Sequence, residues 1–238
     1  MSIISPRETF DHHLHQLLDQ VLLLGSMVEL AIQQSVDALQ RHDHFLAQRN
    51  YAGDQRINEK RYEIESECVT LIATQQPMGR DMRFLAAILE IITELERIGD
   101  YAKGISKINL LLNDEAGDPS IYYDLHRMAV LGLGMLRRAL DAFVASDVAA
   151  ARAIPSEDDD VDRLYNHIYL DLIHGMVVNT TTVSRASYLM WAAHNLERMA
   201  DRVINICERI VYVVTGEMKE LDAYDSLVKK SPEGLKDE

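Results

Sequence analysis

The sequence predicts an all-α protein made of two tandem antiparallel three-helix bundles related by internal duplication. Apolar residues recur every three or four positions along most of the chain, and no segment shows the alternation of a β-strand. One six-residue motif also occurs twice in closely similar form, as LERIGD at 95–100 and as LERMAD at 196–201. Repeated sets of amphipathic segments with short connections are typical of duplicated helical bundles.

Three helices are predicted in the first half. An apolar stripe from Leu14 to Leu39 predicts the first, and a similar stripe over about 43–76 predicts the second. The second should end at Pro77, since proline removes a backbone donor and clashes with the preceding turn. Residues 78–113 carry the third stripe.

A loop rich in Gly, Pro, Asp and Asn follows at 113–120, and three more helices are predicted after it. They span about 120–145, 147–179 and 183–215, with a kink at Pro155 and a turn at 180–183, where Thr-Thr-Thr-Val is a poor helix interior. We therefore expect one three-helix repeat at 1–115, a second at 119–216, and a polar tail at 217–238.

Composition restricts the function. The net charge is −14 with no basic face, which argues against nucleic acid and anionic lipid as direct partners. Only Cys68 and Cys207 are present, so neither a disulfide framework nor a thiolate zinc site is expected. The longest strongly apolar uncharged run is Met128–Leu136, too short to span a bilayer, and the N-terminus lacks a secretory signal. We expect a cytoplasmic protein without membrane insertion, which reaches a membrane only through other proteins.

The repeated acids are the main candidate site. Glu96 with Asp100, and Glu197 with Asp201, are four residues apart, so each pair sets two carboxylates side by side on a helix. The last helix continues this line through His194, Asn205 and Glu208. A facing helix offers Asp158 and Asp162, which align with Asp54 and Asn58 of the first half. Oxygen-rich sets of this kind suit hard cations such as Mg²⁺, Mn²⁺ or iron.

The acid pairs also fit two simpler interpretations, chance spacing and surface salt bridges. In a chain with 38 acids, chance alone gives about six acid pairs at this spacing, and Arg97 and Arg198 are placed to pair with the same carboxylates. The cluster of His12, His13 and His15 is interpreted as a surface feature, while Trp191 and the many methionines are interpreted as core. Asp171 and His174 imitate only half of a di-iron motif. Catalytic glycine loops and nucleophile motifs are absent from the sequence.

Motifs in both halves of the chain carry a family resemblance. Gln76–Arg83 (QPMGRDMR) followed by Glu94–Asp100 (ELERIGD) resembles the phosphate-uptake regulator family, PhoU. Asn195–Asp201 with the trailing Asn205–Glu208 is similar to that family's second copy, and the likeness covers about residues 10–216. Arg80 and Arg83, within the first segment, are candidates either for docking an acidic partner or for intramolecular salt bridges.

The resemblance implies a cytoplasmic, homodimeric and non-enzymatic regulator. It would link a phosphate ABC transporter ATPase to a phosphate-sensing histidine kinase and keep the response off when phosphate is plentiful. It further implies a metal patch in each repeat. The first would use Glu96, Asp100, Asp54 and Asn58, and the second Glu197, Asp201, Asp158, Asp162 and Asn205.

The resemblance leaves the metal open among Mg, Mn, Fe and Zn, with divalent or trivalent charge. The first patch departs from the family pattern at Gly104 and Lys107, so the second is expected to bind better. A carboxylate-bridged metal enzyme or a metal-storage bundle is the alternative function.

Overall fold

The computed structural model describes residues 6–112 and 118–221, and all regular elements in these ranges are helices. The first half contains α1 (Pro6–Arg41), α2 (His44–Gln75) and α3 (Arg80–Leu111). The second contains α4 (Pro119–Ala145), α5 (Val148–Ala153), the 3₁₀ turn η1 (Ile154–Glu157), α6 (Asp158–Val178), the 3₁₀ turn η2 (Thr180–Thr182) and α7 (Val183–Thr215). The predicted pair of antiparallel three-helix bundles is confirmed.

Aspartates begin three of these helices. Asp43 accepts a hydrogen bond from the Leu46 amide (2.9 Å), while Asp118 and Asp147 cap α4 and α5 in the same way. Such caps satisfy backbone donors that have no partner within the helix. At the other end of α2, Gln76 adopts a left-handed conformation (φ 46°) directly before Pro77, and the helix ends there.

The fifth predicted helix is interrupted where Pro155 predicted a kink. The backbone tightens into η1 and then resumes as α6, so that Asp158, Asp159 and Asp160 occupy the first turn of a new helix. Carboxylates are favoured at that position by the positive end of the helix dipole. The interruption thus decides which end of a helix the acidic run occupies.

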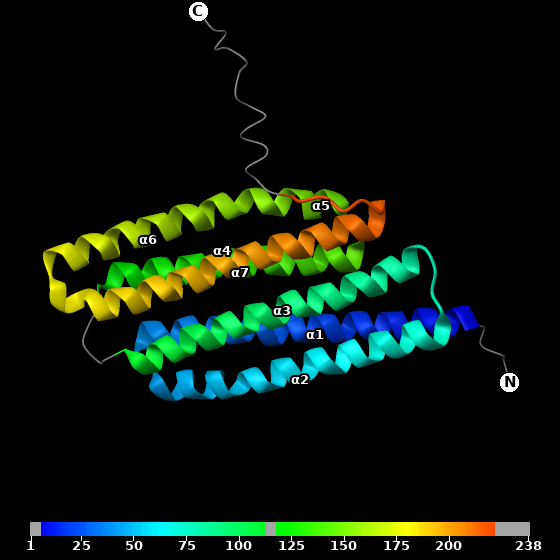
Figure 1. Ribbon diagram of the computed structural model, residues 1–238, viewed down its shortest axis with the longest axis horizontal. Coiled ribbons are helices and arrows are strands. Elements are labelled where there is room, and N and C mark those ends of the chain that lie inside the picture. Colours follow the sequence, from blue (N-terminus) through cyan, green and yellow to red (C-terminus); the bar gives the residue numbers. More distant parts are fainter. Residues whose placement is uncertain (1–5, 113–117, 222–238) are drawn as a thin grey trace, which may run out of the picture.

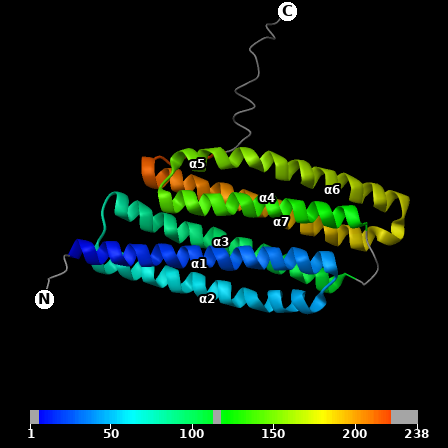
Figure 2. The ribbon, with the colours of Figure 1, turned by 180° about the vertical axis from the view of Figure 1, so that it is seen from behind.

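The long helices of the two bundles pack in layers, with one helix of each bundle on the outside (Figures 1 and 2). The long helices α1, α3, α4 and α7 lie side by side, while α2 lies along one outer edge and α6 along the opposite one. At the boundary between the bundles α3 runs along α7, where Arg209 Nε lies 2.8 Å from Glu90 Oε2. Across the α1–α4 boundary, Arg137 Nε lies 2.7 Å from Glu29 Oε2.

The core extends through both bundles. The expectation that the methionines and Trp191 lie in the core is met only in part. Met128, Met135 and Met199 are fully buried, whereas Met82 on α3 is 40% exposed, Met78 is 84% exposed and Met218 is 63% exposed. Trp191 is 60% exposed, so its assignment to the core was wrong. It falls on the outer side of α7, whereas the buried stripe passes through the neighbouring Leu189 and Ala192.

One helix in the described ranges, Arg7–Arg41, is long and apolar enough to cross a membrane by length and composition. A buried core helix meets the same criterion, and here Val21, Leu24 and Val28 are fully buried against the rest of the bundle. The helix therefore serves as a core element.

The predicted boundary loop falls mainly on 113–117 and most of the predicted tail on 222–238, outside the described residues. The proposed domain limits therefore remain predictions. Residues 217–221 are described and are not helical, and the Leu221 amide donates to Glu208 Oε1 (3.0 Å).

Candidate functional site

The four predicted residues of the first patch lie together between α2 and α3. Asn58 Nδ2 donates to Asp54 Oδ2 (3.0 Å) on one helix, and Glu96 and Asp100 face this pair from the other. Burial and the neighbouring acids raise the pKa of Glu96 and of Asp100 above their ordinary values. The fold thus brings separate parts of the sequence to one acidic face.

A lysine enters this first patch. Lys103 Nζ lies 2.6 Å from Asp54 Oδ2 and 4.0 Å from Asp100 Oδ1, and these carboxylates raise the pKa of Lys103. Lys103 was not among the residues predicted for this patch, although its position three residues after Asp100 places it on the same helix face. Lys103 thus neutralises one of the three carboxylates of the first patch, which makes that patch less suited to a metal ion, although Asp54 Oδ1 is buried without a hydrogen bond.

The second patch lies between α6 and α7 and has no such lysine. The position equivalent to Lys103 by the hexad alignment is Ile204, which is buried. Asp158 and Asp162 project from the start of α6 toward Glu197 and Asp201 of α7, near enough for their charges to interact. The two bundles therefore share an acidic framework but differ in its charge balance.

Two oxygens of the second patch lack donors. Asp158 Oδ1 and Glu197 Oε2 are buried without a hydrogen bond, although His194 Nδ1 approaches the latter to 3.3 Å. Burial, reinforced by the surrounding acids, raises the pKa of Asp158 to about 7 and that of Glu197 to about 7. Unpaired buried carboxylate oxygens are costly, and a bound cation would remove that cost.

Not every predicted ligand reaches the second patch. Asn205 Nδ2 instead donates to Glu94 Oε2 (3.3 Å) across the α3–α7 boundary, where Arg202 also contacts Glu94. Within the described ranges, no three His, Cys, Asp or Glu side chains are arranged as a complete metal centre. The second patch is therefore an acidic face with unpaired oxygens and an incomplete ligand shell.

The segment at 76–83 makes intramolecular contacts. Asp81 pairs with Arg7 near the start of α1, and Arg80 Nη2 contacts Ser146 Oγ at 3.4 Å. Arg83 Nε contacts the Val213 carbonyl at 3.4 Å, at the end of α7. The segment thus fastens α1, α3, the α4–α5 turn and α7 at one end of the molecule.

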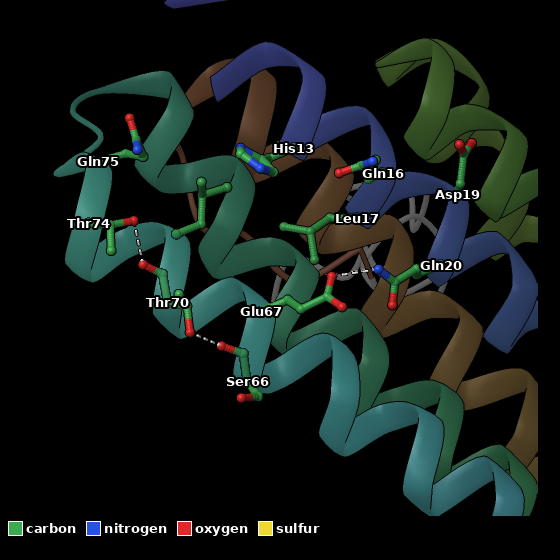
Figure 3. Close-up of a pocket in the computed structure, with 11 residues that line it drawn as sticks. His13, Gln16, Leu17, Asp19, Gln20, Ser66, Glu67, Thr70, Thr74 and Gln75 are labelled. Carbon is green, nitrogen blue, oxygen red and sulfur yellow. Dashed lines mark hydrogen bonds between the residues drawn. The ribbon is translucent and has the colours of Figure 1, made fainter. Parts of the chain in front are cut away.

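A polar hollow of about 620 Å³ lies between α1 and α2, and its lining residues include no member of either acidic patch (Figure 3). Gln20 Nε2 donates to Glu67 Oε2 (2.5 Å), and the Thr70 and Thr74 hydroxyls donate to backbone carbonyls one turn earlier. These contacts pair the Gln20, Glu67, Thr70 and Thr74 side chains within the protein. His13 lies at its rim, while His12 and His15 are exposed on α1.

The fold and the paired patches define a class of protein: a duplicated helical bundle with a carboxylate-lined face in each copy. The family model "PhoU domain" matches the chain twice, at residues 21–108 and 125–210. The chain belongs to the PhoU family.

Several relatives extend over nearly the whole chain. It is 36% identical over 210 residues to a "Phosphate-specific transport system accessory protein PhoU homolog" of Caulobacter vibrioides, covering 88% of this chain and 91% of the relative. A homolog with the same description from Clostridium acetobutylicum is 33% identical over 217 residues, covering 91% and 99%.

Solved structures share the fold. The crystal structure of the phosphate transport system regulatory protein PhoU from Streptococcus pneumoniae superposes with a TM-score of 0.81 at 32% identity, covering 88% of this chain and 99% of that one. PhoU from Pseudomonas aeruginosa gives 0.82 at 32% identity, covering 87% and 100%.

Proposed function

We propose that this chain is a non-enzymatic regulator of phosphate uptake and of phosphate-responsive signalling. The observation that carries the proposal is the double match to the PhoU domain, in the same order and register as the two acidic faces. Relatives of this length are described as accessory or regulatory proteins of phosphate transport. A fold alone would not support the assignment, since helical bundles host many functions.

The proposed partners are the ATPase of a phosphate ABC transporter and a phosphate-sensing histidine kinase. In phosphate-rich medium the chain, acting as a cytoplasmic homodimer, restrains both uptake and kinase output. Its net charge of −14 supports protein partners over nucleic acid. Such a role needs binding surfaces rather than a catalytic group.

The second proposed property is metal binding at the second patch. Glu197 and Asp201 on α7, with Asp158 and Asp162 on α6, would hold a hard divalent or trivalent cation that replaces their mutual repulsion with attraction. The unpaired buried oxygens Asp158 Oδ1 and Glu197 Oε2 support this proposal. Asp162 is exposed, so a change of its rotamer would add one more ligand. Solvent would supply the remaining ligands.

Deletion of the gene tests the regulatory role. Loss of the chain is expected to raise expression from a phosphate-starvation reporter in phosphate-rich medium, because the restraint on the kinase is removed. Complementation with the unaltered chain should restore the low output. Reporter activity that stays low in the deletion strain would refute the proposed function.

Matched double variants test the metal proposal. Titration calorimetry of the metal-free protein with Mn²⁺ and Fe²⁺ should show binding that Glu197→Ala with Asp201→Ala abolishes. The equivalent change in the first bundle, Glu96→Ala with Asp100→Ala, should leave that binding largely intact, since Lys103 already neutralises that patch. Equal binding by all three proteins contradicts the ligand assignment, and oxygen consumption by the iron-loaded protein would instead indicate a bundle enzyme.

A further inference from the structure

The C-terminal half of α6 concentrates exposed apolar side chains. Five large apolar residues within ten positions are exposed there: Tyr169, Leu170, Ile173, Val177 and Val178. Elsewhere in residues 6–112 and 118–221, no separate stretch of ten positions exposes more than two. We call these five residues the α6 outer face, because α6 lies along the outer edge of the second bundle (Figure 1).

The inner side of the same helix segment is apolar as well. Ile168 and Leu172 are buried against the rest of the bundle. On the opposite side, Leu170 is 66% exposed and Val177 is 77% exposed. Among the long helices of the described ranges, α6 packs against α4 and α7 alone. A helix that is apolar around its whole circumference is typically covered on all sides, so the α6 outer face lacks the cover that its sequence calls for.

The duplicated fold does not require these apolar residues. The offset of 104 positions that aligns α2 with α6 places Ser66 opposite Leu170, and Ala73 opposite Val177. The corresponding helix of the first bundle therefore carries small or polar side chains at these outward positions. The larger apolar side chains of α6 are explained better by binding than by folding.

The α6 outer face is also nearly free of charge. Residues 164–178 contain a single Asp, Glu, Lys or Arg, which is Asp171, although the charged share of the whole chain, 26%, would give about four. Each copy of the chain carries a net charge of −14, so two copies repel one another over most of their surface. They approach most easily where charged side chains are missing. The α6 outer face meets that condition, so it suits a second copy of this chain.

We propose that the α6 outer face is the homodimer interface, where α6 packs antiparallel against α6 of a second copy. Leu170, Ile173 and Val177 follow one another at steps of three and four, the spacing at which the side chains of paired helices interdigitate. A two-fold axis near Ile173 sets Leu170 beside the partner's Val177, so one patch serves both copies. The inference rests on the proposed function for the existence of the homodimer and deepens it by naming the surface.

The acids at the start of α6 decide the direction of the pair. Asp158, Asp159 and Asp160 occupy the first turn of this helix. In a parallel pair these turns would lie side by side and repel. In an antiparallel pair about an axis near Ile173 they lie about 40 Å apart along the helices. That separation is several times the screening length of about 8 Å at physiological ionic strength, so the repulsion between the two turns is removed.

A lipid bilayer suits this face less well than a second copy does. Helices that bind bilayers usually carry Lys and Arg beside their apolar residues, and residues 164–178 contain neither. The net charge of −14 adds repulsion from anionic lipid. A contact between identical uncharged faces carries no such penalty.

Sedimentation equilibrium of the purified full chain tests the interface. The parent chain should dimerise, and Ile173→Glu with Val177→Glu should weaken dimerisation at least about a hundredfold, because four carboxylates would then meet in an apolar contact. The matched control is Val69→Glu with Ala73→Glu, which makes the same charge change at the equivalent exposed positions of α2. The control should alter dimerisation less than about threefold. Circular dichroism checks that both variants keep their helices.

Cross-linking gives a readout that does not depend on the charge variants. Ile173→Cys should form a covalent dimer with a short bismaleimide, since the proposed axis brings the two copies of this position together. Val69→Cys should not. The native thiols of Cys68 and Cys207 are fully buried and do not compete for the reagent.

The two experiments either support the interface or overturn it. Selective weakening by the α6 pair, with cross-linking at position 173 only, supports it. A parent chain that stays monomeric at about 100 μM overturns it, and so does equal weakening by both pairs. Vesicle binding by a monomeric parent that Ile173→Glu with Val177→Glu abolishes would show that lipid covers the face instead. Neither measurement involves the transporter or the kinase, so failure of the interface leaves the reporter test of the regulatory function untouched.

Discussion

Lys103 Nζ lies 2.6 Å from Asp54 Oδ2, so the first bundle supplies its own cation at the point where the second has Ile204. The two copies have therefore diverged in electrostatics while keeping the same framework. Asp54 is buried and Lys103 is partly exposed, which makes this a semi-buried ion pair whose removal leaves an uncompensated carboxylate.

Replacing that lysine should destabilise the protein. Lys103→Ala is expected to lower the free energy of unfolding by about 1–3 kcal/mol, below the cost for a fully buried pair because solvent screens the exposed end. Urea denaturation measures the change. Lys107→Ala, an exposed lysine one turn further along α3, serves as control and should cost less than about 0.5 kcal/mol.

The same substitution should open the first patch to metal. Without the ammonium group, Asp54, Glu96 and Asp100 present the carboxylates that the second patch already has, so Lys103→Ala is expected to add a Mn²⁺-binding event in calorimetry. If the variant is destabilised yet binds no additional Mn²⁺, charge neutralisation is not what distinguishes the patches.

The metal-free protein should lose stability as the pH rises. The pKa values of Asp158 and Glu197 are raised in the folded state, so that state binds more protons than the unfolded chain at intermediate pH. The free energy of unfolding is therefore highest at pH values below the pKa of these carboxyl groups in the unfolded chain, near 4. It falls as the pH rises and stops falling once the pH has passed their folded-state pKa of about 7. Thermal melts between pH 5 and 8 should show a loss on the order of 2 kcal/mol.

Asp158→Asn separates stability from binding in that experiment. It removes one of the repelling carboxylates, so the metal-free variant should be more stable than the parent at pH 8 and less sensitive to pH, while its affinity for Mn²⁺ falls. A variant with an unaltered pH profile would show that the acids of the second patch do not repel one another as their positions indicate.

Packing between the bundles gives a further prediction. A Cβ atom on Gly25 of α1 would lie 2.4 Å from Leu140 Cδ1 of α4, whereas one on Gly53 of α2 would meet nothing within 4 Å. Gly25→Val is therefore expected to cost about 1–3 kcal/mol by overpacking the α1–α4 contact. Gly53→Val should change stability by less than about 0.5 kcal/mol, and similar melting temperatures for both would show that the contact is not close-packed.

Arg83 should hold the end of α7 in place. Arg83→Ala removes the contact with the Val213 carbonyl and is expected to cost about 0.5–1.5 kcal/mol. Hydrogen exchange should quicken in the last turn of α7 and not in the first turn of α4. Arg80→Ala, which removes the contact with the Ser146 hydroxyl, is the control and should leave hydrogen exchange in the last turn of α7 unchanged.

The sequence by itself determined the helices and their duplication. Periodicity at three and four residues identifies a helix face wherever the core is apolar, and Pro77 and Pro155 mark the interruptions because proline removes a backbone donor. The repeated hexads placed Glu96 with Asp100 and Glu197 with Asp201, since residues four apart on a helix are neighbours whatever surrounds them.

Tertiary structure decided the contacts between helices. Periodicity does not tell which way a side chain at the edge of a stripe turns, so Asn205 was expected in the second patch and lies instead against Glu94, and Trp191 was expected in the core and is exposed. Lys103 acquires its role only because packing of α2 on α3 places Asp54 beside it, a pairing across 49 positions that no local spacing encodes. Spacing along the chain determines which side chains are neighbours on one helix. Which charged group lies opposite each carboxylate depends on which helices pack against one another in the core.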